Sequence, residues 1–212
     1  MTRRHARGYG HGTRHALRAL LAELESLGEH HDRSVTTPDE RLRNITRDTG
    51  EFLAVLVRAT GARRILEIGT SNGYSTLWLA EAARALGGRV TTVEWAAGRW
   101  SMAGEHFARA GLADVIESLH AEAGRVLDRE APASRDLVFL DADRERYVDW
   151  WPVVRETLAP GGLLVVDNAT SHADELAPFI DLVEADDDFT TSLVPVGKGE
   201  FLATRTPASA TA

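Results

Sequence analysis

The chain has 212 residues, contains no cysteine and carries a formal net charge of −8. This length suits one α/β domain and is short for two, and a chain without cysteine forms neither disulfides nor thiolate metal sites. Because no apolar run reaches about 18 residues and no signal-peptide core follows the N-terminus, we expect a cytoplasmic protein without membrane partners.

Charge is unevenly distributed along the chain. Residues 1–18 contain five arginines and no acid, so the remainder is strongly acidic. We predict a basic flexible arm over residues 1–12 and a single domain over 13–212, with N-terminal helices at 13–62 and a Rossmann-like core at 63–206. The arm offers an RNA contact as an alternative, but an acidic body disfavours nucleic-acid binding.

The segment before the core has helical periodicity. Its apolar spacing predicts helices over residues 13–27 and 38–60. Thr37 to Glu40 supply a start signal for the second helix, and Gly61 supplies its stop.

From Arg63 onward, predicted strands and helices alternate. This order indicates an α/β fold with a mostly parallel sheet, helices on both faces and ligands at the carboxyl ends of the strands. Residues 189–195 and 200–204 flank a glycine-containing turn, which predicts an antiparallel C-terminal hairpin. The expected strands are 64–68, 89–94, 114–119, 135–140 and 161–166, and the expected helices lie near 74–86, 97–110, 121–129, 145–158 and 173–186.

The loop from Gly69 to Gly73 joins the first of these strands to a helix. Such a loop brings free backbone N–H groups to a ligand, although a glycine pattern by itself is equally typical of a packing turn. Glu94 ends the second strand, about 20 residues further on, where an acid can bind ribose hydroxyls. Together these residues favour a nucleotide-type cofactor site.

Acids also follow the fourth and fifth strands. Asp141 ends the fourth strand, and Asp167 and Asn168 end the fifth, so the three side chains are expected at one crevice. Hard oxygen ligands of this kind suit Mg²⁺. Taken singly, each aspartate is equally typical of a helix cap.

From about Ile45 to Arg205 the chain resembles the cation-dependent O-methyltransferases, the family that includes catechol and caffeoyl-CoA O-methyltransferases and bacterial relatives. The family has a Rossmann-like class I S-adenosylmethionine fold that ends in an antiparallel hairpin. The motifs that carry the resemblance are Leu66–Thr70 with Gly73–Ser75, Phe139–Asp143 with Tyr147, Pro160–Gly162, and Asp167–Asn168.

The resemblance implies S-adenosylmethionine as cofactor, a divalent cation, a small catechol-like or natural-product acceptor with a hydroxyl group, and a homodimer. Trp95 is expected either to stack on adenine or to pack, partly buried, on the following helix. The implied cofactor contacts are Ile45, Glu67, Gly69, Thr70, Ser75, Glu94, Ala123 and Asp141, and the implied metal ligands are Asp141, Asp167 and Asn168.

The chain departs from the family at Arg144. Relatives carry a lysine there that is thought to act as general base, whereas arginine stays protonated. Arg144 is therefore either a charge-stabilising group or a tolerated surface replacement. Lys198, the only lysine, lies in the predicted hairpin and is not expected to replace it. His172 is the alternative base, since imidazole transfers protons near neutrality, or else a surface histidine.

Two further functions compete with O-methyl transfer to a small molecule. One is tRNA methylation with the basic arm holding RNA. The other is a cofactor-binding sensor that lacks a base and has little or no catalytic activity.

Overall fold

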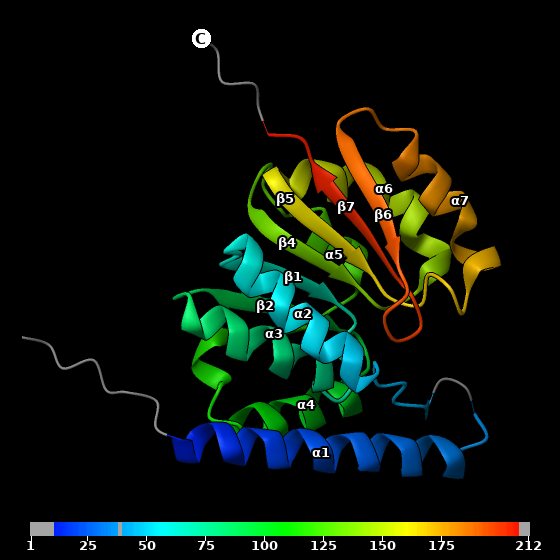
Figure 1. Ribbon diagram of the computed structural model, residues 1–212. Coiled ribbons are helices and arrows are strands. Elements are labelled where there is room, and N and C mark those ends of the chain that lie inside the picture. Colours follow the sequence, from blue (N-terminus) through cyan, green and yellow to red (C-terminus); the bar gives the residue numbers. More distant parts are fainter. Residues whose placement is uncertain (1–10, 38–39, 208–212) are drawn as a thin grey trace, which may run out of the picture. The chain divides into compact units, whose positions relative to one another are not determined.

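The computed structural model describes residues 11–37 and 40–207 (Figure 1). Residues 1–10 of the predicted arm lie outside this part. The chain forms two compact units, one ending at Arg43 and the other beginning at Asn44. The first unit contains α1 (His11–Ser34), which is longer than predicted. In the last turn of α1, the Asp32 carboxylate accepts hydrogen bonds from the backbone N–H groups of Leu42 and Arg43, which follow the helix, at 2.7 and 2.9 Å.

The second helix begins later than predicted. Residues 41–46 are not helical, and α2 spans Arg47–Thr60, so the start signal at 37–40 was wrong; Pro38 and Asp39 themselves are outside the described residues. Thr46 is the true N-cap, and its hydroxyl accepts a hydrogen bond from Thr49 N at 3.2 Å. The predicted stop is confirmed, because Gly61 has a φ of 71° and its N–H bonds the Val57 carbonyl.

A seven-stranded sheet forms the centre of the second unit. Its strand order is β3-β2-β1-β4-β5-β7-β6; neighbours among the first five strands are parallel, and β7 is antiparallel to both β5 and β6. The mostly parallel sheet and the C-terminal hairpin are thereby confirmed. The strands are β1 (Arg64–Ile68), β2 (Arg89–Glu94), β3 (Ile116–His120), β4 (Arg135–Leu140), β5 (Leu158–Val166), β6 (Phe189–Val194) and β7 (Glu200–Arg205).

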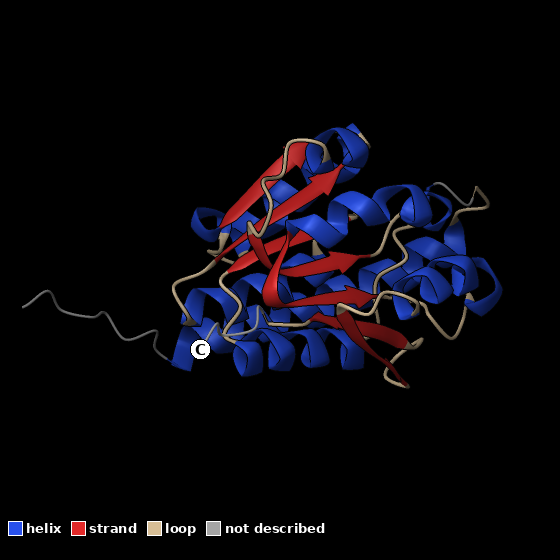
Figure 2. Cartoon of the chain, turned by 90° about the horizontal axis from the view of Figure 1, so that it is seen from above, coloured by secondary structure: helices blue, strands red, loops and turns tan. Residues whose placement is uncertain are grey.

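Helices cover both faces of this sheet (Figure 2). Side chains alternate along β1: Leu66 and Ile68 join the buried cluster that includes Trp151 and Phe179, whereas the equally buried Ile65 points to the opposite face. The remaining helices are α3 (Tyr74–Ala85), α4 (Ala97–Arg109), α5 (Ala123–Leu127), α6 (Tyr147–Thr157) and α7 (Ala173–Glu184), with 3₁₀ turns at Ala113–Val115 and Arg144–Arg146.

Strand β5 and helix α5 differ most from the predicted core elements. Strand β5 begins at Leu158, three residues before the predicted start, because Arg135 of β4 pairs with Leu158 ahead of a register shift. Helix α5 has only five residues.

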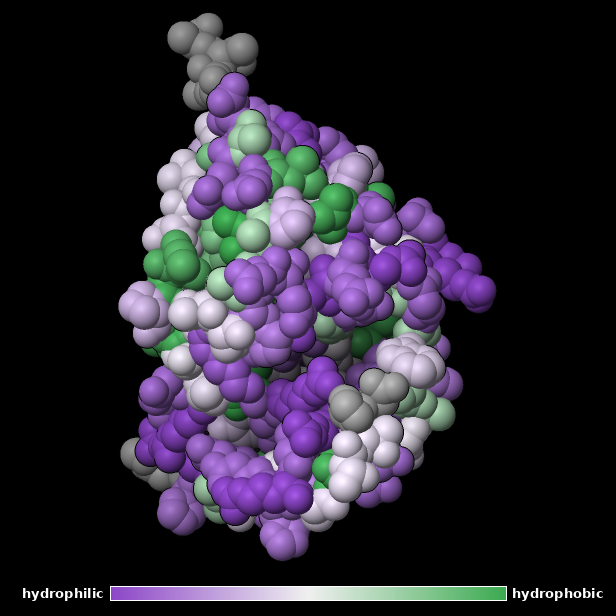
Figure 3. All heavy atoms as spheres, turned by 90° about the vertical axis from the view of Figure 1, so that its right-hand side faces the viewer, coloured by the Kyte–Doolittle hydropathy of each residue, from purple (hydrophilic) through white to green (hydrophobic). Residues whose placement is uncertain are grey.

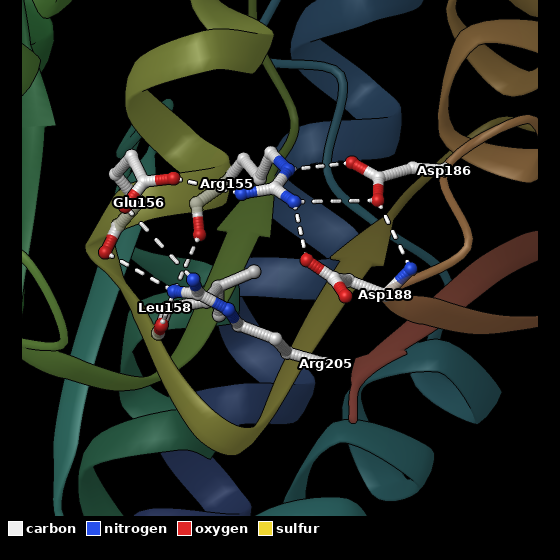
Figure 4. Close-up of polar contacts among 6 residues, drawn as sticks. All are labelled: Arg155, Glu156, Leu158, Asp186, Asp188 and Arg205. Carbon is white, nitrogen blue, oxygen red and sulfur yellow. Dashed lines mark hydrogen bonds and ion pairs between the residues drawn. The ribbon is translucent and has the colours of Figure 1, made fainter. Parts of the chain in front are cut away.

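Arginines and acids form a network where β5 begins and β7 ends (Figure 4). Arg155 Nε donates to Asp186 at 2.6 Å, and the same guanidinium also bonds Asp188. Arg205 Nη1 donates to the carbonyl oxygens of Arg155 and Leu158 at 3.1 and 2.7 Å. The network ties α6, the segment before β6 and the end of β7 together.

Polar side chains predominate on the face drawn in Figure 3, and the hydrophobic ones form small separate groups. Within residues 11–37 and 40–207, no helix has the length and apolar character needed to cross a bilayer.

Candidate active site

Backbone hydrogen bonds bring the strand ends to one edge of the sheet. Gly69 N donates to Val93 O at 3.1 Å, Asp141 N to Ile68 O at 3.0 Å, and Asp167 N to Leu140 O at 3.2 Å. The predicted cofactor loop and the predicted metal ligands therefore follow neighbouring strands, as the alternating pattern indicated.

Two positions of the loop, Gly69 and Gly73, can be occupied only by glycine. Gly69 has a φ of 107°, and a Cβ there would lie 2.1 Å from the backbone oxygen of Asp141. Gly73 has a φ of 87°, and a Cβ there would lie 2.5 Å from the Phe107 ring. Ser71 between them also has a positive φ, 49°. The loop thus packs directly against the segment that carries Asp141.

Glu67 is fully buried beneath this loop. Its carboxylate accepts hydrogen bonds from Ser75 Oγ at 2.6 Å, from Thr92 Oγ1 at 2.6 Å and from the hydroxyl of Thr76. Burial raises its pKa to about 7, although the three hydroxyls oppose the shift. Sequence reasoning missed Thr76 and Thr92; the signal for Thr92 is its register position opposite Glu67 in β2.

Glu94 is buried at the end of β2. Its Oε2 accepts from Ser71 N at 2.9 Å, and its Oε1 accepts from Ala96 N at 2.9 Å and Arg99 Nε at 3.2 Å. A carboxylate has about four acceptor positions, so one remains for a ribose hydroxyl. Sequence reasoning missed Arg99, which lies five residues after Glu94 in the first turn of α4.

Trp95 and Ala123, the two residues expected near the adenine, follow strands β2 and β3 close to Glu94. The side chain of Trp95 is 70% exposed, so the expectation that it packs on the following helix was wrong. Ala123 begins α5 after β3, and Ala121 N bonds Glu94 O at 3.1 Å, which keeps this segment at the same edge of the sheet.

Asp141, Asp167 and Asn168 lie together, as predicted. Asn168 Nδ2 donates to Asp141 Oδ1 at 3.2 Å and to Asp167 Oδ2 at 2.7 Å. The other oxygen of Asp167, Oδ1, is buried and has no hydrogen-bond partner. Burial, followed by repulsion from Asp167, raises the pKa of Asp141 well above its usual value.

A divalent cation fits the chemistry of this group. It would bind the unpartnered Asp167 oxygen and remove the repulsion between the two carboxylates. Rotation of the Asn168 amide about χ2 would turn its oxygen toward them. Across the described residues, no three or more His, Asp or Glu side chains form a metal-ligand set. Waters or acceptor oxygens would therefore supply the rest of the coordination, as is usual for Mg²⁺.

Arg144 and His172 are the two predicted catalytic residues. Arg144 lies in the 3₁₀ turn after β4 and donates from Nε to Glu175 Oε2 at 2.8 Å. His172 immediately precedes α7, and its Nδ1 lies 2.9 Å from Ser171 Oγ. Both follow strands that carry proposed metal ligands, and their catalytic roles stay predictions.

The turn of the C-terminal hairpin reaches the same edge (Figure 1). Lys198 O accepts from Thr170 N and Ser171 N at 3.1 and 3.0 Å, and Gly199 O accepts from Ala169 N at 2.8 Å. Burial and Asp167 raise the pKa of Asp141, and the Lys198 ammonium partly offsets this rise. Sequence reasoning missed that the hairpin turn brings Lys198 near Asp141, and whether Lys198 replaces the family lysine stays untested.

The start of α2 meets the hairpin from the other side. Ile45 is buried one residue before the N-cap Thr46. Thr49 Oγ1 donates to Oε1 of Glu200, the first residue of β7, at 2.8 Å. Burial and the nearby Asp167 carboxylate raise the pKa of Glu200 to about 10. Glu200 was missed because no motif contains it; the only signal was an acid opening a strand that is otherwise largely apolar.

The sequence profile of the O-methyltransferase family matches residues 18–206. The chain belongs to the O-methyltransferase family. The resemblance inferred from the motifs is thus confirmed at the level of the family.

Two curated relatives of the chain are named catechol O-methyltransferase. The protein from Mycobacterium tuberculosis is 38% identical over 133 residues, which are 63% of this chain and 60% of that protein. The protein from Niastella koreensis is 31% identical over 153 residues, 71% of this chain and 65% of that protein. Both matches span slightly less than two thirds of the relative.

Solved structures show the same fold. The O-methyltransferase from Bacillus cereus in complex with SAH superposes with a TM-score of 0.74 at 25% identity and covers 89% of this chain and 91% of that one. TomG from Streptomyces achromogenes, an O-methyltransferase involved in tomaymycin synthesis and solved with SAM, has a TM-score of 0.72 at 28% identity, covering 90% and 89%. The class I methyltransferase fold is confirmed.

Proposed function

We propose that this protein is an S-adenosylmethionine-dependent O-methyltransferase. It uses a divalent cation, Mg²⁺, and acts on a hydroxyl of a small catechol-like or natural-product acceptor. The observation that carries the proposal is the contact between Gly69 and the Asp141 backbone, which joins the cofactor loop to the carboxylate pair. Membership of the family and the SAH and SAM bound to its solved members support the choice of cofactor.

Eight residues are assigned to the cofactor. The fixed carboxylate of Glu67 suits an ammonium group, because three hydroxyls hold its orientation. Glu94 retains acceptor capacity for the ribose. Ile45, Gly69, Thr70 and Ser75 would complete the methionine side. Ala123 would contact the adenine, and Asp141 would contact both the cofactor and the cation.

Little chemistry is demanded of the side chains. A sulfonium methyl is already activated, so the enzyme must hold an oxygen nucleophile in line with it at near-attack distance. A divalent cation at Asp141, Asp167 and Asn168 would lower the pKa of a coordinated hydroxyl. His172 then assists by accepting the proton, and Arg144 and Lys198 stabilise negative charge that develops on the acceptor.

A homodimer and a cytoplasmic location remain predictions beside this proposal. The small acceptor is favoured over nucleic acid because the chain after the arm is acidic.

A methyl-transfer assay tests the proposal. Labelled S-adenosylmethionine is incubated with a panel of catechol-type acceptors, once with Mg²⁺ and once with a chelator. We expect label on an acceptor oxygen only with Mg²⁺. Transfer that is insensitive to chelator would contradict the cation, and tight cofactor binding without transfer to any acceptor would favour the cofactor-binding sensor.

A further inference from the structure

Glu200 is a buried carboxylate without an assigned role. The pairing of Val166 in β5 with Phe201 in β7 is antiparallel, so the next residues, Asp167 and Glu200, also lie opposite each other. Glu200 is fully buried and Asp167 is 3% exposed. The fold therefore places a third acid directly beside the proposed cation ligands.

Two oxygens of this pair receive no hydrogen bond from a donor outside it. Glu200 Oε1 accepts from Thr49 Oγ1 at 2.8 Å, whereas the buried Glu200 Oε2 and Asp167 Oδ1 have no such donor. The two carboxyl groups lie within hydrogen-bonding reach of each other, and this contact helps to raise the pKa of Glu200. Leaving a buried charged group without a partner is costly, and an apolar residue at the start of β7 would avoid the cost. These atoms are the kind that a bound cation would satisfy.

Two other acids that are partly or wholly buried pair with arginines. Glu130 pairs with Arg135 at 2.5 Å, and Glu94 pairs with Arg99 at 3.2 Å. No ion pair within 4.0 Å is formed by Glu200 in the described part of the chain. Its nearest polar partners are a hydroxyl and another acid, so a bound cation would stabilise its ionised form.

We propose that Glu200 is the third carboxylate of the cation site and sets its affinity for a divalent ion. This inference rests on the cation proposed above. The three carboxylates of Asp141, Asp167 and Glu200 are not arranged to contact one ion together. Glu200 therefore lies behind Asp167 and attracts the cation by its negative charge without binding it directly. Thr49 holds the carboxylate in place and thereby links the start of α2 to the ion.

Cation binding to the full-length protein tests this assignment. Mn²⁺ affinity is measured by electron paramagnetic resonance in the presence of SAH, for the wild type and Glu200→Gln. We expect the variant to bind Mn²⁺ about tenfold or more weakly, in the range typical for groups behind metal ligands. SAH affinity, measured separately by calorimetry, is expected to be unchanged.

The charge of the probe separates an electrostatic role from a structural one. Coulomb energy scales with ion charge, so a tenfold loss for Mn²⁺ predicts a loss of about thirtyfold for Tb³⁺, read by its luminescence. A purely structural role would not produce this scaling. Glu200→Leu, which removes the charge and suits a buried strand, should show the same losses if Glu200→Gln does not fold.

Matched variants complete the experiment. Glu130→Gln removes a partly buried carboxylate at the opposite end of the sheet and should leave Mn²⁺ affinity unchanged. Thr49→Val keeps the Glu200 charge and should weaken binding less than Glu200→Gln does. Equal Mn²⁺ affinity in the wild type and both Glu200 variants would overturn the inference alone. Absence of Mn²⁺ and Mg²⁺ binding to the wild type would overturn the proposed cation as well.

Discussion

At the amino ends of the parallel strands acids lie beside arginines, whereas at the carboxyl ends Asp141, Asp167 and Glu200 lie beside one another. Glu94, which pairs with Arg99, is the exception at the carboxyl ends. Asp136, at the start of β4, pairs with Arg64 at 2.5 Å, and although burial opposes the shift, hydrogen bonds from Arg64 lower its pKa. The hydrogen bond from Arg155 likewise lowers the pKa of Asp186. At the other end, burial raises the pKa of Glu67, and burial and Asp167 raise that of Asp141.

The two ends therefore contribute differently to the protein. Paired charges at the amino ends hold the ends of elements together and leave nothing for a ligand to satisfy. The carboxyl ends keep unpartnered oxygens and raised pKa values, a state that costs stability in the free protein and is typical of functional sites. Substitutions at one end should change stability, and those at the other should change activity.

The largest effect is expected from Asp167→Asn, which removes a proposed cation ligand without changing side-chain size. Stabilisation of the reacting oxygen by a metal is worth several kcal/mol, so kcat/KM should fall by about a thousandfold. Methyl transfer is measured with Mg²⁺ over a range of concentrations.

Asp136→Asn is the matched change at the amino ends. It removes the partner of Arg64 and should lower the melting temperature while leaving kcat/KM unchanged. A large loss of activity in Asp136→Asn, or full activity in Asp167→Asn, would break the division between the two ends.

A smaller effect is expected from Glu67→Gln, which should change how the free energy of unfolding depends on pH. Its folded pKa of about 7 lies above its ordinary value, so its contribution is fully present below about pH 4.5 and is lost as the pH rises through 7. For a fully buried group this amounts to about 3 kcal/mol. The free energy of unfolding is measured as a function of pH for the wild type and Glu67→Gln, without cofactor or cation. The difference between the two proteins gives the contribution of Glu67.

Glu130→Gln should give the opposite slope. Burial opposes the shift, but Arg135 lowers the pKa of Glu130, so its contribution is present above the ordinary pKa and is lost as the pH falls through the folded value. Parallel slopes in the two variants would contradict the contrast between the ends of the sheet.

The smallest effect is expected from His172→Ala. If the cation performs most of the deprotonation, the loss in kcat/KM is about tenfold, below the usual range for general bases. The pH profile of kcat/KM should also lose one ionisation. An unchanged rate and profile would remove His172 from the mechanism, and a loss of several hundredfold would make it the principal base.

The core of the fold could be predicted because its signals are local. Apolar runs ending in Gly69, Glu94, Asp141 and Asp167 fix strands β1, β2, β4 and β5, and their alternation with helices fixes a parallel sheet. The start of α2 could not be predicted in the same way. A Thr-Pro-Asp-Glu sequence competes with Thr46 as a cap, and the Asp32 carboxylate, a tertiary partner, binds the intervening backbone.

The site was predicted where it depends on strand ends and was missed where it depends on register. Thr92 reaches Glu67 because β1 and β2 pair in one register, and Glu200 reaches Asp167 because β5 and β7 do. The position of Lys198 was missed for the same reason, since the path of the hairpin turn depends on the backbone contacts of Thr170 and Ser171. Spacing within a single strand carries none of this information.

The close approach of Gly69 to the Asp141 carbonyl has a thermodynamic consequence. Since no side chain fits between them, the loop proposed for the cofactor and the acid proposed for the cation pack against each other as one unit. The free-energy cost of ordering this unit is incurred when the first ligand binds. The second ligand therefore binds to an already ordered site and has a higher affinity. Cofactor and cation should then bind cooperatively, and reciprocity makes the enhancement the same in either order of addition.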